Sequence, residues 1–491
     1  MFSKITPEQA GISSRKIAAF IRLLEKCDFN THGVLLMRGN QIFAEYYWAP
    51  FTKDTCHRMY SQTKSLVSIA IGLLEEEGKL RLDDYAYTYF PDRVKTDIPE
   101  TLKKQTIRDM LKMETCGETE GWFTSDEPDR TKLYFERTRV THPSGTIWSY
   151  DSAGSQVLAS LVEKLSGKSL LDYLREKLFS KMGTFQTAAI LKTKNEDSWG
   201  DSAMLCTLRD MASFGRFVMN YGTWNGERLM NEKYLREATS CLAANNISGF
   251  NGVFSHGYGY QIWKTEQDGF AFVGMGNQLT VCLPKKDLIF AYIADNQGYE
   301  ASEEVIINEL FDLIANDLGD ALPEDQAAEA ELNETATELK LQAARGRQSS
   351  VFETEISGQK YVCDDNPMEI TEFSLTFDGN GEGVFQYTNA QGKKKLPFGM
   401  GKNVFGKFPQ FGYSNEHGGL SAGGDFMYDC AASAAWQEER KLILRVQIID
   451  RYLGNFAAVF SFKEDAVVVS MTKTAENFLS EYDGMLTGKK A

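Results

Sequence analysis

The strongest constraint on the fold is that strand-like segments lie on both sides of a long helical block. Apolar runs at 34–37 and 42–46 flank Arg38-Gly39-Asn40, which predicts a β-hairpin. From Ser61 to about Met230 the signals are helical, because capping residues and following glycines bound segments of helical periodicity. Strand signals resume at 257–263, 270–273, 279–283 and 288–294. We therefore expect an α+β fold, with an antiparallel sheet flanked by helices and a helical insertion over about 60–235.

The rest of the chain has a different pattern. A length of 491 residues exceeds what one hydrophobic core usually serves, so two or three domains are expected. Composition changes over 320–348, which is rich in Ala, Glu and Gln and predicts a helical linker. Beyond it, apolar residues alternate with period two between Gly-Asn turns. We therefore expect a first domain over 1–319, the linker over 320–348 and an all-β C-terminal domain over 349–491.

Charge and composition narrow the range of partners. The formal net charge of −15 argues against nucleic acid and anionic membranes, which would repel an acidic surface. The N-terminus lacks an apolar signal core and no later run is long enough to span a membrane, so we expect a cytoplasmic protein. The eight cysteines include no CxxC pair, which favours reduced thiols, and the five histidines form no HExxH motif, so no metal site is expected.

The strongest local signal for chemistry is the tetrapeptide Ser61-Gln62-Thr63-Lys64 before a long apolar helix. A spacing of three places the serine hydroxyl and the lysine amine on one helical face, where a lysine made neutral by burial can take the serine proton. The helix N-terminus adds N–H groups near a developing oxyanion. As a bare string the motif is weak, since it also occurs at Ser13, Ser357 and Ser470, and a helix cap beside a solvated lysine is the alternative.

Five groups of motifs in order give the Ser61 motif a context. They lie at 59–64 with 78–84, 106–113, 143–154, 208–215 and 274–278. From about 33 to 314 the chain thereby resembles the serine β-lactamase and penicillin-binding-protein superfamily. The resemblance is to its class C β-lactamase and family VIII esterase branch, which also contains the nylon-oligomer hydrolases.

The resemblance implies roles for the second motif of that family, Tyr-x-Asn. Tyr150 takes the tyrosine position, and the resemblance makes it a proton carrier and the base for the deacylating water. Ser152 stands where asparagine is usual, so a substrate contact there is expected from a hydroxyl instead of an amide. A buried structural tyrosine is the alternative for Tyr150.

The third family motif is Lys-Thr-Gly or His-Thr-Gly on an edge strand. By register Phe272-Val273-Gly274 stands there, and the resemblance makes the N–H of Met275 the second oxyanion donor beside that of Ser61. Gly274 and Asn277 are expected to contact substrate, although a simple bulge at Gly274 is the alternative reading. Because Phe272 is not basic, a neutral ester or amide is favoured over a penicillin.

The expected function is that of a serine hydrolase that cleaves a small ester or amide through an acyl-enzyme on Ser61. Lys64 and Tyr150 move the protons, and no cofactor is needed. A β-lactamase, a D-amino-acid peptidase and a non-catalytic binding or sensor relative are the alternatives, and a homodimer is left open.

Other motifs support competing chemistry less well. The strings Tyr387-Thr-Asn389 and Tyr413-Ser-Asn415, and His417-Gly-Gly, lie in the β-rich half without a following helix. The segment 419–423 fits the GxSxG nucleophile elbow, but no histidine follows it to act as base. The acidic pairs Asp109/Glu114 and Glu118/Glu120 are typical of a solvated surface.

Overall fold

The computed structural model describes residues 2–94, 97–246, 252–418, 426–475 and 478–491. The chain forms two compact units. The first contains Met1–Lys340 with Glu416–Gly418, and the second contains Leu341–Asn415 with Gly419–Ala491. The division at 340/341 lies inside the segment for which a linker is predicted.

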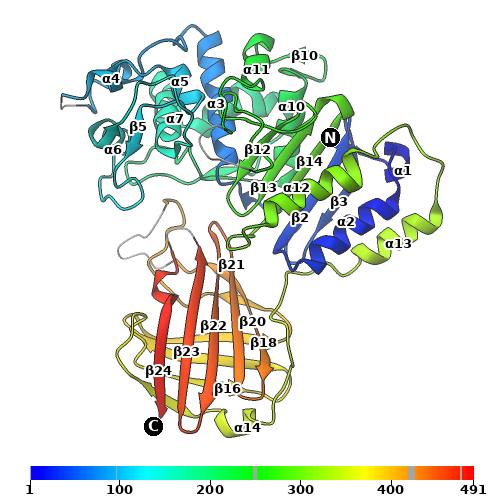
Figure 1. Ribbon diagram of the computed structural model, residues 1–491, viewed down its shortest axis with the longest axis vertical. Coiled ribbons are helices and arrows are strands. Elements are labelled where there is room, and N and C mark those ends of the chain that lie inside the picture. Colours follow the sequence, from blue (N-terminus) through cyan, green and yellow to red (C-terminus); the bar gives the residue numbers. More distant parts are fainter. Residues whose placement is uncertain (1, 95–96, 247–251, 419–425, 476–477) are drawn as a thin grey trace. The chain divides into compact units, whose positions relative to one another are not determined.

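A seven-stranded sheet forms the centre of the first unit (Figure 1). All neighbouring strands are antiparallel except β1 and β3. In spatial order its strands are β1 (Ser3–Lys4), β3 (Gln41–Tyr47), β2 (Thr31–Arg38), β14 (Leu288–Ala294), β13 (Gln278–Leu283), β12 (Phe270–Gly274) and β11 (Trp263–Lys264).

Both faces of this sheet are buried, as the continuous apolar strand β14 illustrates. Phe290 and Tyr292 face one core, which contains residues of α2 (Ser14–Lys26), α12 (Ser302–Glu309), η4 (Leu310–Ala315) and α13 (Gln326–Ala336). Ile289 and Ala291 face the other core, which contains residues of the insertion. Because successive side chains of a strand point to opposite faces, one apolar run serves both cores.

The insertion between β3 and β11 is mainly helical, with α3 (Gln62–Glu76) at its centre against α7 (Ser152–Ser166) (Figure 1). Residues Gln62–Leu74 are all buried, which explains why this helix has apolar side chains on every face. Its other helices are η1 (Ala86–Tyr89), α4 (Glu100–Lys103), α5 (Ile107–Leu111), α6 (Arg130–Arg137), α8 (Leu170–Leu174), η2 (Arg175–Phe179), α9 (Ser180–Met182), α10 (Leu208–Met219) and α11 (Glu232–Ala238). Its short strands are β4 (His57–Arg58), β5 (Gly117–Thr119), β6 (Thr138–Val140), β7 (Ala189–Ile190), β8 (Met204–Cys206), β9 (Thr223–Trp224) and β10 (Glu227–Arg228).

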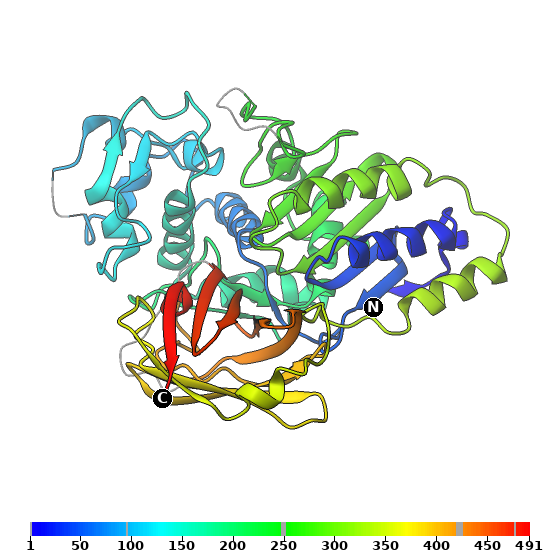
Figure 2. The same ribbon diagram turned by 60° about the horizontal axis from the view of Figure 1, so that its bottom comes forward.

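The second unit is a closed β-barrel (Figure 2). Its ten-stranded sheet closes because β18, at one end of the strand order, also pairs with β20 near the other end. Two short helices, α14 (Glu353–Ile356) and η5 (Ser480–Tyr482), belong to this unit. The first unit also contains the short helices α1 (Pro7–Ala10) and η3 (Pro284–Lys286). The barrel strands are β15 (Lys360–Cys363), β16 (Glu372–Phe377), β17 (Glu382–Asn389), β18 (Gly392–Met400), β19 (Val404–Lys407), β20 (Asp429–Glu438), β21 (Lys441–Ile449), β22 (Leu453–Lys463), β23 (Ala466–Ala475) and β24 (Gly484–Lys490).

The predicted fold class is confirmed, but one expected strand is wrong. Residues 257–262 do not form a regular strand, because Gly257 and Gln261 have φ values of 114° and 57°. The Gln261 N–H instead donates to the Leu111 carbonyl, 2.9 Å away, so this segment turns toward the insertion. In the part of the chain that the structure describes, every helix is too short or too polar to cross a bilayer.

A buried pair of histidines joins the sheet to the insertion. His32 on β2 lies 2.7 Å from His57 on β4, measured between Nδ1 and Nε2. His57 Nδ1 lies 3.1 Å from the Arg58 carbonyl, to which it donates, so His57 Nε2 accepts from His32. Burial lowers the pKa of His57 to about 4 and that of His32 well below its ordinary value.

This pair predicts a loss of stability in mild acid. Because the unfolded chain takes up protons on these histidines near pH 6.5 and the folded chain does not, the contribution of the pair to the free energy of unfolding falls as pH drops from about 6.5 to 4. For His57 the loss amounts to about 3 kcal/mol across that window. Urea denaturation at pH 7.5, 6 and 5 measures it.

A matched pair of variants separates this effect from other titrations. Relative to the wild type, His57→Gln is expected to lose less stability as pH falls from 6.5 to 5, whereas His256→Gln, at an exposed position, is expected to follow the wild type. Burial raises the pKa of Glu303 to about 7, so this carboxyl group acts in the opposite direction over the same window, but it does so equally in the wild type and in both variants. Equal slopes for the wild type and His57→Gln would contradict the assignment.

Candidate active site

The chain turns sharply into α3 at Ser61. Tyr60, immediately before it, has a φ of 45°, and the Thr63 hydroxyl donates to the Tyr60 carbonyl at 2.6 Å. The Thr63 hydroxyl also accepts from the Met204 N–H at 3.0 Å, which ties the turn to β8. The Ser61 hydroxyl does not cap the helix and is therefore available for other contacts.

Lys64 lies one helical turn after Ser61 and contacts it directly. Its Nζ donates to Ser61 Oγ at 2.9 Å and to the carbonyl of Asp201 at 2.6 Å. The Asp201 carboxylate is 4.0 Å away. Lys64 is only 1% exposed, so its amine is almost entirely removed from water. Spacing along the helix and burial thus bring a hydroxyl and an amine together.

Tyr150 lies directly before α7 and beside the same amine. Lys64 Nζ is 5.1 Å from the centre of the Tyr150 ring, and the ring stacks on Trp263 at 5.7 Å. Tyr150 is 39% exposed, which leaves the ring open to solvent or to a bound molecule. Asp151 fixes the start of α7, because its carboxylate accepts the Gly154 N–H at 2.9 Å, and burial raises the pKa of Asp151.

The end of β12 abuts the turn at Ser61. A Cβ built on Gly274 would lie 2.3 Å from the Met59 carbonyl and 3.2 Å from the Ser61 nitrogen, so only glycine allows this approach. Met275 follows, with its side chain 37% exposed. Among the described residues, neither the Ser61 N–H nor the Met275 N–H donates to another backbone group. Two free donors beside a hydroxyl are what an oxyanion requires.

The remaining predicted binding residues lie differently. Ser152, the first residue of α7, is half-buried. Asn277 is buried, and its side-chain oxygen accepts from Asn296 at 2.9 Å and from the Ser302 hydroxyl at 2.6 Å. Its side chain therefore stabilises the turn between β12 and β13. Phe272 is fully buried with its ring 4.9 Å from that of Phe214, so it points into the core.

Residues of the competing motifs make structural contacts away from Ser61. Tyr387 is buried in the second unit, with its hydroxyl 2.8 Å from that of Tyr482. Tyr413 is equally buried, and the GxSxG segment 419–423 lies outside the described residues. Asp109 caps α5, while Glu114 pairs with Lys112. Among the described residues, no group of three or more His, Cys, Asp or Glu side chains could hold a metal ion.

Two residues near the site were missed by the sequence argument. Asp201 reaches Lys64 from 137 positions away, and Trp263 lies 113 positions after Tyr150. Neither belongs to a motif with functional spacing. Their proximity results from packing of the loop before β8 and of β11 against the helices, for which no local signal exists.

Comparison with known proteins identifies the family of the chain. The sequence profile of the Beta-lactamase family matches residues 18–311. The chain belongs to the Beta-lactamase family. Its fold is of the β-lactamase and transpeptidase type, followed by a separate β-barrel.

Relatives of this β-lactamase family member include two amide hydrolases by name. It is 26% identical over 292 residues to 6-aminohexanoate-dimer hydrolase of Paenarthrobacter ureafaciens, covering 56% of the chain and 74% of the relative. It is 23% identical over 239 residues to D-aminopeptidase of Brucella anthropi, covering 41% of the chain and 45% of the relative. The chain is thus a serine hydrolase of the amidase and esterase kind.

One solved structure shares the fold of the whole chain. The octameric penicillin-binding protein homologue from Pyrococcus abyssi aligns over 96% of this chain and 99% of its own. The TM-score is 0.50 and the identity 14%. The likeness includes the region of the β-barrel.

Proposed function

We propose that the chain hydrolyses a small ester or amide through an acyl-enzyme on Ser61. The observation that carries the proposal is the 2.9 Å contact between the Ser61 hydroxyl and the amine of the buried Lys64. A buried lysine beside a hydroxyl is an established way to generate a serine nucleophile. The exposed ring of Tyr150 beside the same amine supplies a second group for proton transfer.

The proposed reaction has two steps. In the first, neutral Lys64 takes the Ser61 proton as the serine oxygen attacks the substrate carbonyl, and the N–H groups of Ser61 and Met275 hold the oxyanion. Tyr150 then gives a proton to the leaving alcohol or amine as the acyl-enzyme forms. In the second step, Tyr150 takes a proton from water, the hydroxide attacks the ester, and Ser61 regains its proton.

The neutral ester is the first substrate candidate, because the third-motif position carries Phe272, an apolar side chain directed into the core. The amide is the second candidate, since two relatives are named for amide substrates. A β-lactam ranks third. Turnover of p-nitrophenyl esters, amino-acid amides, short peptides and a chromogenic cephalosporin would rank them directly. In the substrate pocket, Ser152 and Gly274 are the proposed contacts.

The proposed surroundings follow from charge. An acidic chain with a net charge of −15 suits a cytoplasmic enzyme that acts on small neutral or cationic molecules without nucleic acid or membrane partners. A homodimer is the simplest assembly to test, by light scattering.

Covalent labelling tests the nucleophile without knowledge of the substrate. A fluorophosphonate is expected to form one adduct, located by peptide mass spectrometry on Ser61, because this hydroxyl alone is paired with a buried amine among the Ser-x-x-Lys strings. Ser470→Ala is the matched control and should label as the wild type does. A folded protein without an adduct would support the alternative that the chain is a non-catalytic binding protein. An adduct on another residue would show that Ser61 is not the nucleophile.

A further inference from the structure

The amine of Lys64 is held by one residue outside the family motifs. Asp201 lies in the loop before β8 and is 3% exposed. Its carbonyl accepts from Lys64 Nζ at 2.6 Å, and its carboxylate lies 4.0 Å from the same atom. The backbone and the side chain of Asp201 therefore both place an oxygen near the amine. An amine on a flexible four-carbon chain needs such contacts to keep one orientation.

Asp201 is in turn held by α7 through its neighbours in the loop. The side-chain amide of Gln156 donates to the Ser198 carbonyl at 2.9 Å and accepts from the Gly200 N–H at 2.9 Å. A Cβ on Gly200 would lie 2.1 Å from the Ala159 side chain, so the loop lies directly against the helix. Gln156 thus binds the backbone just before Asp201 at two positions, Ser198 and Gly200.

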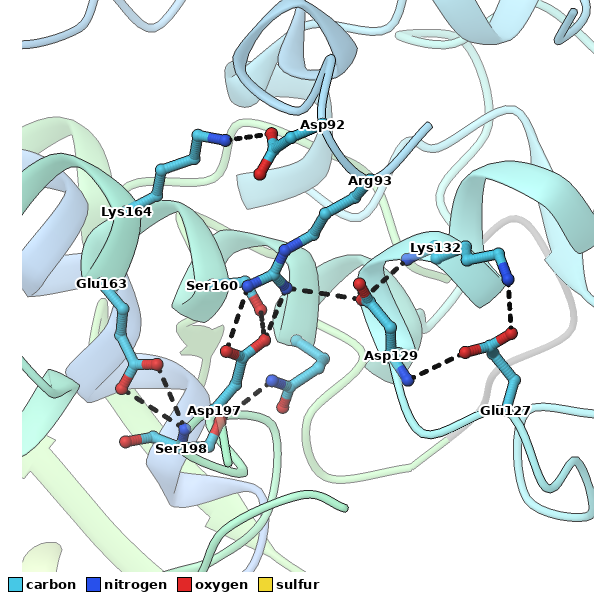
Figure 3. A network of polar contacts seen from close by, with 11 residues as sticks. Asp92, Arg93, Glu127, Asp129, Lys132, Ser160, Glu163, Lys164, Asp197 and Ser198 are labelled. Atoms are coloured by element: carbon cyan, nitrogen blue, oxygen red, sulfur yellow. Dashed lines mark hydrogen bonds and ion pairs between the residues drawn. The ribbon is translucent and has the colours of Figure 1, made fainter. Parts of the chain in front are cut away.

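A network of charges anchors the start of this loop (Figure 3). Arg93 binds both carboxylate oxygens of Asp197, at 2.6 and 3.1 Å, and lies 3.4 Å from Asp129. The Ser160 hydroxyl also donates to Asp197, at 3.2 Å. Bidentate pairs between arginine and carboxylate fix geometry better than single contacts do.

The same helix binds the loop a second time. The carboxylate of Glu163 accepts the Ser198 N–H, with the nitrogen 3.2 and 3.3 Å from its two oxygens (Figure 3). It also accepts the Leu170 N–H at 2.8 Å. Burial raises the pKa of Glu163, while these donors oppose the rise. The loop is thus attached to α7 at Asp197, Ser198 and Gly200, which leaves Asp201 little freedom to move.

We propose that Asp201 is a positioning residue of this hydrolase: it holds the Lys64 amine against Ser61, and its negative charge sets the pH range in which Lys64 accepts the serine proton. The inference rests on the proposed function. Removing the carboxylate charge favours the neutral amine, so proton acceptance begins at lower pH. Loss of the second contact at the same time loosens the amine and lowers the maximal rate.

The charges around Lys64 show why Asp201 is the group to change. Tyr150 and Asp151 face the amine from the start of α7, and Arg130 of α6 faces Asp201. Burial raises the pKa of Asp151 in spite of the nearby Lys64, and its carboxylate is already engaged by the cap of α7. Arg130 contributes no negative charge.

The test is the pH profile of kcat/KM with p-nitrophenyl acetate. The wild-type rate is expected to rise from acid to alkaline pH. In Asp201→Asn the midpoint of the rise is expected to move to lower pH by about one unit, because an opposite charge at this distance shifts proton affinity by that order. The alkaline plateau is expected to fall by up to about tenfold. The ratio of variant to wild-type rate is therefore higher at pH 6 than at pH 9.

Controls distinguish charge from structure. Asp201→Glu retains the charge and is expected to restore the wild-type midpoint. Asp210→Asn removes another buried carboxylate, one that caps α10 and binds the Phe185 N–H at 2.6 Å, and is expected to leave the midpoint unchanged. If Asp201→Asn does not fold, Asp201→Ser provides the same test, since it also removes the charge and keeps the carbonyl.

The outcomes separate this inference from the proposed function. A wild-type midpoint in both charge-removing variants, with Ser61→Ala inactive, would overturn the role of Asp201 and leave the nucleophile intact. An active Ser61→Ala would overturn the proposed function itself. The pH dependence of Ser61 labelling by a fluorophosphonate should show the same shift as turnover, because only the first proton transfer is involved.

Discussion

Replacing Ser61 with alanine is expected to lower kcat/KM for any substrate by at least about a thousandfold, because no other group can form the acyl-enzyme. Stability should hardly change. The Ser61 hydroxyl makes no capping bond to α3, and Lys64 keeps its contact with the Asp201 carbonyl when the hydroxyl is gone. A melting temperature within about 2 °C of the wild type is therefore expected.

The matched control for this experiment is Ser470→Ala, which removes a serine from another Ser-x-x-Lys string, on β23. Both proteins should be assayed with the same ester and melted by calorimetry. Full activity is expected for Ser470→Ala. If Ser61→Ala keeps more than about a tenth of the activity, Ser61 is not the nucleophile.

The second large effect is expected at Gly274. Alanine there would place its Cβ 2.3 Å from the Met59 carbonyl, so β12 and the turn before Ser61 must move apart. Such a movement separates the N–H groups of Ser61 and Met275. Since loss of one oxyanion donor costs about a hundred- to a thousandfold in kcat, we expect a loss of that order with a smaller change in KM.

Gly406→Ala is the control for the added methyl group. Gly406 lies in β19 with no heavy atom within 4 Å of a built Cβ, and alanine there should leave kcat unchanged. Steady-state kinetics of both variants, with circular dichroism to verify folding, decide the matter. A Gly274→Ala enzyme with wild-type kcat would show that this approach of two backbones does not form the oxyanion site.

Much of the fold could be predicted because its signals are local. The hairpin of β2 and β3 follows from two apolar runs around a Gly-Asn turn, and α3 follows from a helix start before a long apolar run. The pairs Thr106/Asp109 and Thr207/Asp210 form the capping boxes that their spacing indicates. Each of these features depends on residues less than about one helical turn or one hairpin apart.

Features that depend on residues far apart in the chain could not be predicted from the sequence. The alternating strands of the second half indicated an all-β domain, but not that β18 closes the sheet on β20. The apolar residues at 257–263 indicated a strand, whereas Gln261 turns to bind helices of the insertion through Ser65 and Leu111. A segment with several apolar residues can bury them either as a strand in a sheet or as a turn packed against helices. The neighbouring element in the tertiary structure determines which of the two forms.

In the candidate site, too, the features set by local spacing could be predicted and the contacts set by tertiary packing could not. The sequence by itself determined that Ser61 and Lys64 share one helical face and that Tyr150 precedes a capped helix, because both are consequences of spacing and capping. Only the tertiary structure decided that Asp201 holds the Lys64 amine, that Asn277 turns inward, and that Phe272 points into the core. These contacts join residues far apart in the chain, and their energies come from packing that no local pattern encodes.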